Sequence, residues 1–446
     1  MLVMRAALFL ALLLSLTGAG LVPAGARLAP RQQTASAAAA ATATPPPPQR
    51  DERLWRKALA IHRKAIVVDG HNDITSPMID EGYDLGTPSV GKYHTDLARM
   101  KQGGMTGQFF SIYVDQSYAK EGGSARRAMD MIDSVYRLVE RYPEDFLMAA
   151  SAAEIRRAKR QKKMAALMGI EGGHAIENSL GALRDFYRLG IRYMTLTHNN
   201  TNDWADSCCD TARHNGLSDF GREVVREMNR LGMLIDVSHV SDKTMSDILD
   251  TSKAPVIASH SSARAIANHR RNIPDDLLRR IATNGGVVMV NFYPGFIDRK
   301  VIDAARERSE RLKPELDALS ERYKDNPEQL RAERTKLFAL HPLPLTPLSV
   351  LIDHIDHIAK VAGIDNVGLG SDFDGVSSLP QDMQDIAQLP NITYELLRRG
   401  YTERDIRKVL GENLLRAFAQ AEEVSRRSSR TISGEGSQRR LEVKKG

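Results

Sequence analysis

The sequence predicts an α/β protein built as a (β/α)8 TIM-type barrel with a charged helical insertion. Three observations predict it: eight short apolar runs alternate with amphipathic helical stretches, ligand-capable polar residues follow almost every run, and one highly charged segment interrupts the alternation. The chain has 446 residues and is 42% hydrophobic, which is enough to bury a core of this size.

The eight apolar runs are the expected strands. They span Ala65 to Asp69, Gln108 to Tyr113, Ala165 to Ile170, Tyr193 to Thr197, Leu234 to Val237, Val256 to Ala258, Val287 to Asn291 and Val367 to Gly370. An open doubly wound sheet would show the same alternation, but neither a Gly-x-Gly-x-x-Gly after the first run nor a Gly-x-x-x-x-Gly-Lys occurs. Polar residues at the carboxyl ends of the runs favour the barrel, because barrel active sites lie on that face.

The stretches between the runs have helical patterns. Residues 218–231 place Phe220, Val224 and Met228 on one face and are followed by Gly232, which is typical of a helix end. Near the carboxyl terminus, Thr402 and Asp405 have the spacing of a capping box before further apolar positions. Both segments are therefore expected to be helices on the outside of the barrel.

Residues 298–341 interrupt the alternation. Of these 44 residues, 21 are Asp, Glu, Lys or Arg, and Pro314 and Pro327 lie among them. The composition predicts a solvated helical insertion, and its simplest interpretation is a surface excursion without a catalytic function.

The amino terminus has the pattern of an export signal, predicted as residues 1–26. Arg5 precedes the apolar run Ala6 to Leu16, and small residues end at Ala24-Gly25-Ala26. This run is shorter than the about 20 residues that span a bilayer, although an uncleaved anchor helix is the alternative. We expect a periplasmic or secreted bacterial protein, with residues 27–50 as an Ala/Thr/Pro-rich linker.

The body of the protein is expected at residues 51–424, followed by a basic, flexible tail at residues 425–446. This tail has no apolar stretch, so no lipid anchor is expected. The formal net charge is +6, but the first 50 residues contribute +4 and the tail +5, which leaves −3 on the body. An acidic body argues against nucleic-acid binding, because that function needs basic residues on the folded surface.

The two cysteines of the chain, Cys208 and Cys209, are neighbours. Their Cα atoms are about 3.8 Å apart across a trans peptide, below the usual disulfide range, so an ordinary disulfide is excluded. A vicinal bridge, a soft-metal site and an incidental pair stay open, and the absence of further ligands at zinc-finger spacing favours the incidental pair.

Histidines and acids follow the runs in one register. The first run leads into His71 and Asp73, which are two residues apart and so point the same way in an extended chain. The later runs are followed by polar residues of the same kinds, namely Glu171, His198, His239, His260 and Asp372. Because the carboxyl ends of parallel barrel strands meet on one face, we expect these side chains to converge.

Imidazole and carboxylate together suit Zn²⁺, and a carboxylate with two oxygens can bridge a pair of ions. Glu171 is the natural bridge. Two bound ions make a hydroxide available at neutral pH, so the chain need not provide a serine or cysteine nucleophile. Accordingly, neither a Gly-x-Ser-x-Gly nor a His-Glu-x-x-His motif occurs.

The sequence resembles the renal (membrane) dipeptidase family of metallopeptidases from about Ile61 to Ala421. Its most specific stretches are VVDGHND, GIEGGHAIENSLGALRDFYRLGIRYMTLTHNNTNDWADS, LIDVSHVS, PVIASHSSARAIANHRRNIPDD, VMVNFY and GLGSDFDGV. The resemblance implies a metallo-dependent hydrolase-like barrel that binds two zinc ions and hydrolyses dipeptides.

The resemblance also implies roles for single residues. One zinc would be bound by His71 and Asp73 and the other by His239 and His260, with Glu171 as the bridge. His198 would stabilise the oxyanion of the substrate carbonyl, Arg271 would bind the dipeptide carboxylate, and Asp372 would transfer the proton to the leaving amine. The implied substrate-binding set is His198, Arg271 and Asp372.

Alternatives remain at this point. Arg271 could pair with Asp275 or Asp276 at the surface, and Asp372 could cap a loop or exchange roles with Asp374. Another dinuclear amidohydrolase, acting on a lactam, ester or N-acyl amino acid, and a catalytically silent binding barrel are the rival functions. The ligand types also suit manganese or cobalt, and a homodimer is compatible with the sequence.

Overall fold

The computed structural model describes the backbone of residues 50–443 and the side chains of residues 50–428. The predicted signal peptide and all but the last residue of the predicted linker lie outside the described residues. Within residues 50–443, every helix is too short or too polar to cross a membrane.

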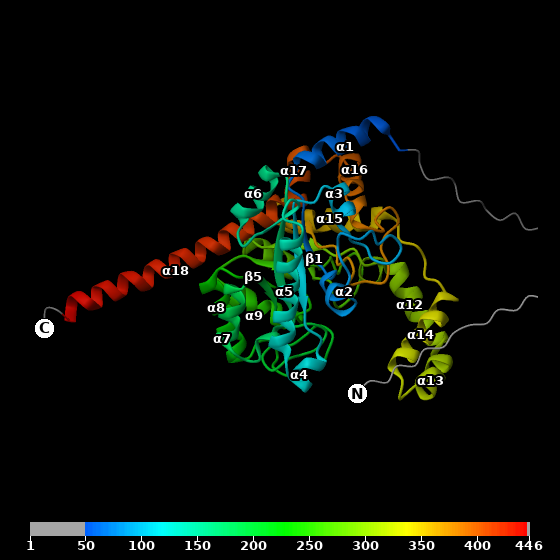
Figure 1. Ribbon diagram of the computed structural model, residues 1–446, viewed down its shortest axis with the longest axis horizontal. Coiled ribbons are helices and arrows are strands. Elements are labelled where there is room, and N and C mark those ends of the chain that lie inside the picture. Colours follow the sequence, from blue (N-terminus) through cyan, green and yellow to red (C-terminus); the bar gives the residue numbers. More distant parts are fainter. Residues whose placement is uncertain (1–49, 444–446) are drawn as a thin grey trace, which may run out of the picture. The chain divides into compact units, whose positions relative to one another are not determined.

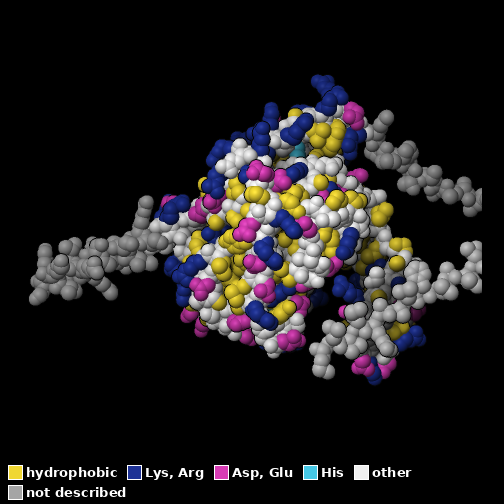
Figure 2. Space-filling view, in the orientation of Figure 1, with side chains coloured by type: hydrophobic (Ala, Val, Ile, Leu, Met, Phe, Trp, Pro, Cys, Tyr) yellow, Lys and Arg dark blue, Asp and Glu magenta, His cyan; other side chains and the backbone are white. Residues whose placement is uncertain are grey.

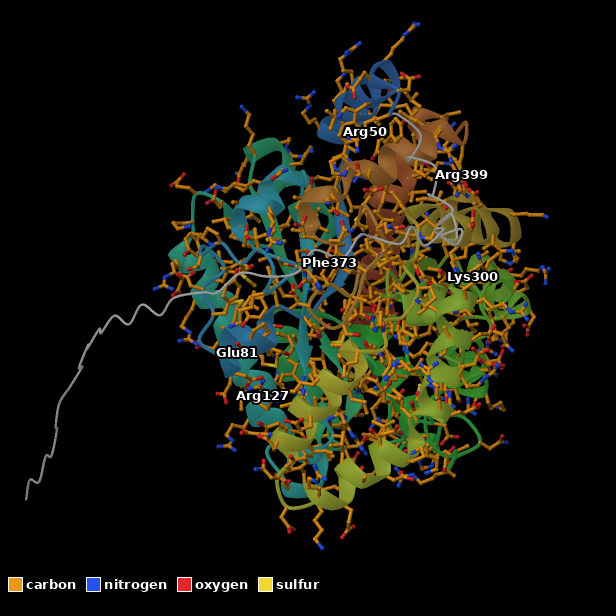
Figure 3. All side chains as sticks on the ribbon, turned by 90° about the vertical axis from the view of Figure 1, so that its right-hand side faces the viewer. Arg50, Glu81, Arg127, Lys300, Phe373 and Arg399 are labelled. Atoms are coloured by element: carbon orange, nitrogen blue, oxygen red, sulfur yellow. The ribbon has the colours of Figure 1, made fainter. Side chains whose placement is uncertain are left out.

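Eight parallel strands form a nearly closed barrel, which confirms the predicted fold. Their spatial order is β1-β2-β4-β5-β6-β7-β8-β9. The bounds are β1 Val68–Asn72, β2 Gly107–Tyr113, β4 Met164–Glu171, β5 Ile191–Thr195, β6 Leu234–Asp236, β7 Val256–Ala258, β8 Val287–Val290 and β9 Val367–Leu369. Backbone hydrogen bonds complete the circle, because the N–H of Asp73 donates to the carbonyl of Phe373 at 2.9 Å. Figure 3 shows Phe373 where the first and last elements of the barrel meet.

Three details of the sheet differ from the sequence prediction. Strand β5 spans Ile191–Thr195 rather than the expected Tyr193 to Thr197. Strand β1 begins three residues later than the apolar run that was assigned to it, since Val68–Asn72 rather than Ala65–Asp69 pairs with β2, with an irregular register between Asp69 and Asn72. A ninth strand, β3 at Phe146–Met148, pairs with β4 outside the barrel path. Its three residues are too few to show a periodicity.

Helices surround the strands (Figure 1). Their bounds are α1 Glu52–Lys64, α2 Thr75–Asp80, α3 Leu97–Gln102, α4 Ser117–Glu121, α5 Ser124–Arg141, α6 Ala152–Gln161, α7 Leu180–Arg188, α8 Asp219–Leu231, α9 Asp242–Thr251, α10 Asp275–Thr283, α11 Pro294–Ile297, α12 Arg299–Arg311, α13 Lys313–Arg322, α14 Pro327–Ala339, α15 Leu348–Ala362, α16 Pro390–Arg398, α17 Glu403–Arg407 and α18 Asn413–Val443. Short 3-10 turns lie at Gly173–Ile176, Ile364–Asn366 and Ile386–Gln388, and a π-turn at Lys408–Glu412 precedes α18.

Both helix ends that the sequence indicates are confirmed. Ser218 caps α8, and Gly232 follows it in the left-handed region at φ 79°. At α17, the hydroxyl of Thr402 accepts a hydrogen bond from the backbone N–H of Asp405 at 3.2 Å.

Successive side chains along each strand point alternately into and out of the barrel, and they therefore form two separate hydrophobic cores. In β2, Phe109 belongs to the core inside the barrel and Phe110 to the core between strands and helices. Strand β8 repeats the pattern with Val287 inside and Val288 outside. Phe418 and neighbouring residues of α18 extend the inner core at the amino-terminal end of the strands. The opposite end of the barrel is therefore left for polar side chains.

The charged segment forms α12, α13 and α14, so the predicted helical insertion is confirmed. Figure 1 shows these helices grouped at one side of the barrel. Asp298, the first residue of the segment, accepts a buried hydrogen bond at 2.8 Å from the hydroxyl of Thr346, which lies five residues beyond its end. At the carboxyl terminus, the segment expected to be a flexible tail is helical in the structure as far as Val443, because α18 continues through residue 425. Basic and acidic side chains are interspersed over the face shown in Figure 2.

Candidate active site

The predicted ligands all lie at the carboxyl ends of the barrel strands. His71 lies within β1, Asp73 is the first residue after the end of β1, and Glu171 is the last residue of β4. His239 and His260 follow β6 and β7 by three and two residues. All five are buried although their side chains are polar. Such burial requires that each finds a partner.

Glu171 is that partner for the three histidines. The Nε2 atoms of His239 and His260 lie 3.0 and 3.3 Å from its Oε1, and Nε2 of His71 lies 3.3 Å from its Oε2. The same Nε2 of His71 is 3.3 Å from Asp73 Oδ2, and the Nε2 atoms of His239 and His260 are 2.9 Å apart. The two oxygens of one carboxylate thus face two separate groups of ligands.

The other ring nitrogen of His71 is held by Tyr193. Its Nδ1 lies 2.8 Å from the Tyr193 hydroxyl, which donates its own hydrogen to the carbonyl of Gly70 at 3.2 Å. The tyrosine oxygen must therefore accept from Nδ1–H, so the neutral ring carries a lone pair on Nε2. Gly169 makes room for this tyrosine, because a Cβ at that position would lie 2.1 Å from the Tyr193 ring.

His239 and His260 are oriented in the same sense. Nδ1 of His239 lies 3.1 Å from the side-chain oxygen of Asn199, which can only accept. Nδ1 of His260 lies 2.7 Å from the Ser259 hydroxyl, which donates to the carboxylate of Asp236 at 2.6 Å and so accepts from the imidazole. Each ring therefore presents a bare Nε2 to Glu171.

These donors fit divalent cations. Three imidazole lone pairs and two carboxylates at short distances repel one another unless a positive charge lies among them. Nε2 of His71 is buried and forms no hydrogen bond, although it lies 3.3 Å from the carboxylates of both Asp73 and Glu171. Three groups of residues each bring their ligand atoms within 4.8 Å of one another. These groups are His71–Asp73–Glu171, Glu171–His239–His260 and His71–His260–Asp372. Hydrogen bonds that fix the second nitrogen are also the usual support of metal-binding histidines.

Electrostatics agree with this interpretation. Burial, with Arg271 and His198 nearby, lowers the pKa of His239 well below its ordinary value, so this ring is neutral as a ligand must be. At His71, burial acts in the same direction, but Tyr193, Glu171 and Asp73 outweigh it and raise the pKa well above the ordinary value. The place beside His71 Nε2 therefore favours a positive charge.

A cavity of about 470 Å³ opens over the ligands. Asp73, Glu171 and His239 form its floor, and His198, Arg271 and Asp372 also line it. The ring of His198 lies 4.5 Å from that of His239 between centroids, and burial lowers its pKa. This volume suits a small ligand.

Arg271 is buried with 4% of its surface exposed. Its guanidinium donates to the carbonyl of His260 at 3.2 Å and to Ser261 Oγ at 3.4 Å, and it lies 5.4 Å from the centre of the Phe296 ring. Asp275, one of the surface partners considered from the sequence, instead pairs with His357 at 2.8 Å. Arg271 therefore presents a buried cation to the cavity.

Asp372 and Asp374 have different surroundings. Asp372 accepts a hydrogen bond from Asn291 at 2.8 Å and belongs to one of the ligand sets. The carboxylate of Asp374 instead accepts a hydrogen bond from the backbone N–H of His94 at 2.7 Å. The backbone N–H of Asp374 donates to Nδ1 of the His94 ring at 2.9 Å. Burial raises the pKa of both carboxyls to about 7, and the charge of Asp73 adds to the effect at each of them. Asp372 is thus the acid that lies against the ligands.

Sequence reasoning missed the residues that orient the ligands. Tyr193 was assigned only to an apolar run, and neither Asn199 nor Ser259 was considered. A partial signal exists, because Asn199 and Ser259 are the immediate neighbours of His198 and His260. Tyr193 gives no such signal, since only the barrel packing brings it to His71.

Comparisons with known proteins agree with this geometry. A model of the membrane dipeptidase family (Peptidase family M19) matches residues 55–431. The chain is similar to the crystal structure of the probable dipeptidase PvdM from Pseudomonas aeruginosa, with a TM-score of 0.72 and 26% identity over 84% of this chain and 100% of that one.

Two further solved structures are similar. The metallopeptidase from Rhodobacter sphaeroides, bound to a phosphinate mimic of the dipeptide L-Ala-D-Ala, gives a TM-score of 0.65 and 26% identity over 80% of this chain and 100% of that one. The dipeptidase AC, a metallopeptidase of family M19, gives 0.66 and 26% identity over 80% and 98%.

Proposed function

The chain belongs to the membrane dipeptidase family (Peptidase family M19), and from this premise we propose that it is a zinc-dependent dipeptidase with two metal ions. His71 and Asp73 would bind one ion, His239 and His260 the other, and Glu171 would bridge them. The observation that carries the proposal is the convergence of three oriented Nε2 atoms on the two oxygens of Glu171.

When bound, two such ions would lower the pKa of a coordinated water molecule far enough to supply hydroxide at neutral pH. The chain itself supplies the remaining groups. His198 donates a hydrogen bond to the carbonyl oxygen of the scissile bond, where negative charge develops. Asp372 accepts a proton from the attacking water and delivers it to the nitrogen of the leaving amine.

Arg271 would select the substrate class. A guanidinium presents a planar pair of donors that matches a carboxylate, and Arg271 is held in place by His260 and Ser261. A free carboxylate bound there, next to the metal ligands, leaves room for one residue on that side of the scissile bond. The proposed substrates are therefore small dipeptides, like the one mimicked in the Rhodobacter sphaeroides structure.

The test is metal analysis of the purified protein together with a substrate panel. We expect two zinc ions per chain and turnover of free dipeptides, with much weaker turnover of carboxyl-amidated dipeptides. Equal turnover of amidated dipeptides would contradict the role of Arg271. Preference for N-acyl amino acids or lactams would favour another dinuclear amidohydrolase, and two bound ions without any turnover would favour a silent binding barrel. If manganese or cobalt is found in place of zinc, the proposed metal is wrong but the proposed dipeptidase activity stands.

We also propose that the protein is exported to the periplasm or secreted. The support is the sequence of residues 1–26, with Arg5, the apolar run and the small residues before position 27. Amino-terminal sequencing of protein from the native cells tests this. A mature chain that begins near residue 27 is the expected result, and an intact amino terminus in the cytoplasm would contradict it.

A further inference from the structure

The adjacent thiols of Cys208 and Cys209 lie close together and can be reached from solvent. Their Sγ atoms are 2.8 Å apart, both residues are half-buried, and neither is in a disulfide. Cys208 lines an open cavity of about 510 Å³ that also contains Asp242, Arg264 and Arg270. None of the residues that line this cavity lines the active-site cavity. A small reagent can therefore approach Cys208 without entering the active site.

The backbone around the two cysteines holds two active-site histidines. The N–H of Cys208 donates to the carbonyl of His239 at 2.8 Å. The hydroxyl of Ser207 donates to the carbonyl of His198 at 2.6 Å and accepts from the N–H of Cys209 at 3.2 Å. The Cys208 N–H thus supports the proposed metal ligand His239 directly, and the Cys209 N–H supports His198 through the hydroxyl of Ser207.

His239 depends on this support. Its φ is 66°, in the left-handed region that residues with a side chain rarely adopt. Besides the N–H of Cys208, its carbonyl accepts from the hydroxyls of Thr197 and Ser207, each at 3.2 Å. A residue in such a conformation persists only where its surroundings hold it there. A change at the Cys208 N–H would therefore reach the imidazole that faces Glu171.

We propose that Cys208 and Cys209 are a reversible oxidation site, at which a small disulfide such as oxidised glutathione closes a vicinal disulfide and thereby lowers activity. One cysteine sulfur attacks the oxidant and releases one glutathione thiol. The second cysteine sulfur then attacks the mixed disulfide and releases the other. The two protein thiols lose two electrons and two protons, and the oxidant becomes two thiols.

Chain geometry makes this bond reversible and couples it to His239. Adjacent Cα atoms are about 3.8 Å apart, below the usual range of about 4.4–6.8 Å for a disulfide, so the ring is strained. Strained disulfides are more easily reduced than structural ones. The strain falls on the Cys208–Cys209 peptide and on the backbone dihedral angles of Cys208. Rearrangement of these angles moves the Cys208 N–H of the preceding peptide and so weakens its hydrogen bond to His239. The thiol reaction is independent of the proposed function, and only its effect on turnover rests on it.

The experiment treats the zinc-loaded full-length protein with oxidised glutathione and then removes the reagent. Intact mass and thiol titration in denaturant report the bond, dipeptide turnover reports activity, and zinc content after dialysis reports His239 independently of turnover. We expect both thiols to be lost with a mass decrease of two hydrogens, a fall in kcat/KM of about tenfold, and recovery with a phosphine reductant.

Cys209→Ser is the matched control, because it keeps the backbone N–H groups and cannot close the ring. We expect it to have normal turnover and to keep that turnover after the same treatment. Unreacted thiols, or glutathione adducts without ring closure, would overturn the proposed bond. Ring closure with unchanged turnover and zinc content, or an equal loss of activity in Cys209→Ser, would overturn its coupling to His239. A protein with no dipeptide turnover would contradict the proposed function, and the mass and zinc measurements would still decide the oxidation site.

Discussion

The ligand end of the barrel and the α12–α14 insertion are built in opposite ways. At the ligand end, hydrogen bonds join residues far apart in the sequence, such as His71 and Tyr193, and the side chains are buried. In the insertion, ion pairs join residues three or four positions apart, such as Lys313 and Asp317 at 2.7 Å, with most side chains exposed. The chemistry therefore depends on long-range packing, whereas the insertion depends on local pattern.

The largest effect is expected at the centre of the ligand end. Glu171→Gln should lose metal and activity together, with kcat/KM reduced about a thousandfold or more, because an amide is neutral and has only one acceptor oxygen. Metal analysis and dipeptide turnover measure it. A variant that keeps both ions and turns over normally would contradict the bridging role.

Asp372→Asn should separate metal binding from turnover. We expect both ions to remain and kcat to fall by about 10²–10⁴, the usual contribution of a general acid or base. Asp374→Asn is the matched control, since Asp374 lines the same cavity but its carboxylate accepts from the N–H of His94 and belongs to none of the ligand sets. If Asp374→Asn loses more turnover than Asp372→Asn, the proton transfer belongs to Asp374.

His354 links the two regions and should make stability depend on pH. Its Nδ1 accepts from the N–H of Ala263, in the loop before Arg271, and its Nε2 donates to the carbonyl of Ile297, just before the insertion. Burial lowers its pKa to about 4. Because the unfolded chain binds a proton near pH 6.5 and the folded one does not, stability should fall as the pH drops from about 6.5 to 4.

The contribution of this histidine is about 3 kcal/mol at the acid end. Urea unfolding at several pH values, compared between the wild type and His354→Gln, measures it. The glutamine variant keeps an acceptor and a donor but does not titrate, so its pH dependence should be shallower. Parallel curves for the two proteins would show that His354 does not carry the effect.

Tyr193→Phe should reduce activity or zinc affinity by about 10–100-fold, because it removes the acceptor that orients His71. Tyr136→Phe is the control, since its hydroxyl bonds only to the carbonyl of Leu189 at an exposed position. Zinc titration and kcat/KM measure both variants. Equal behaviour of the two would mean that the packing of the ring alone positions His71.

The smallest effect is expected in the insertion. Lys313→Ala removes an exposed ion pair within one helix, so the free energy of unfolding should change by no more than about 0.5 kcal/mol, with unchanged turnover. Denaturant unfolding and dipeptide turnover measure it. A marked loss of turnover would show that the insertion takes part in substrate binding, which would remove the contrast between the two regions.

Features that depend on local pattern could be predicted from the sequence. The end of α8 at Gly232, the cap of α17 at Thr402 and the helical character of residues 298–341 follow from side chains near one another in the chain. The strand β3 was missed, because a three-residue strand carries no periodicity. The predicted position of strand β1 was three residues too early, because pairing with β2 rather than the apolar run itself fixes where the strand lies.

By itself the sequence determined the alternation of strands and helices, and with it the rule that Glu171, His239 and His260 lie on one face. Only the tertiary structure decided which nitrogen of each imidazole faces the carboxylates, that Asp372 rather than Asp374 lies beside them, and that Arg271 points into the cavity. The reason is physical. The two-residue period of a strand and the order of the strands determine the face on which any residue lies, whereas a tautomer or an ion pair depends on one particular neighbouring side chain. That neighbour can be adjacent in the sequence, as Ser259 is for His260, or can come from another strand, as Tyr193 does for His71, 122 positions away.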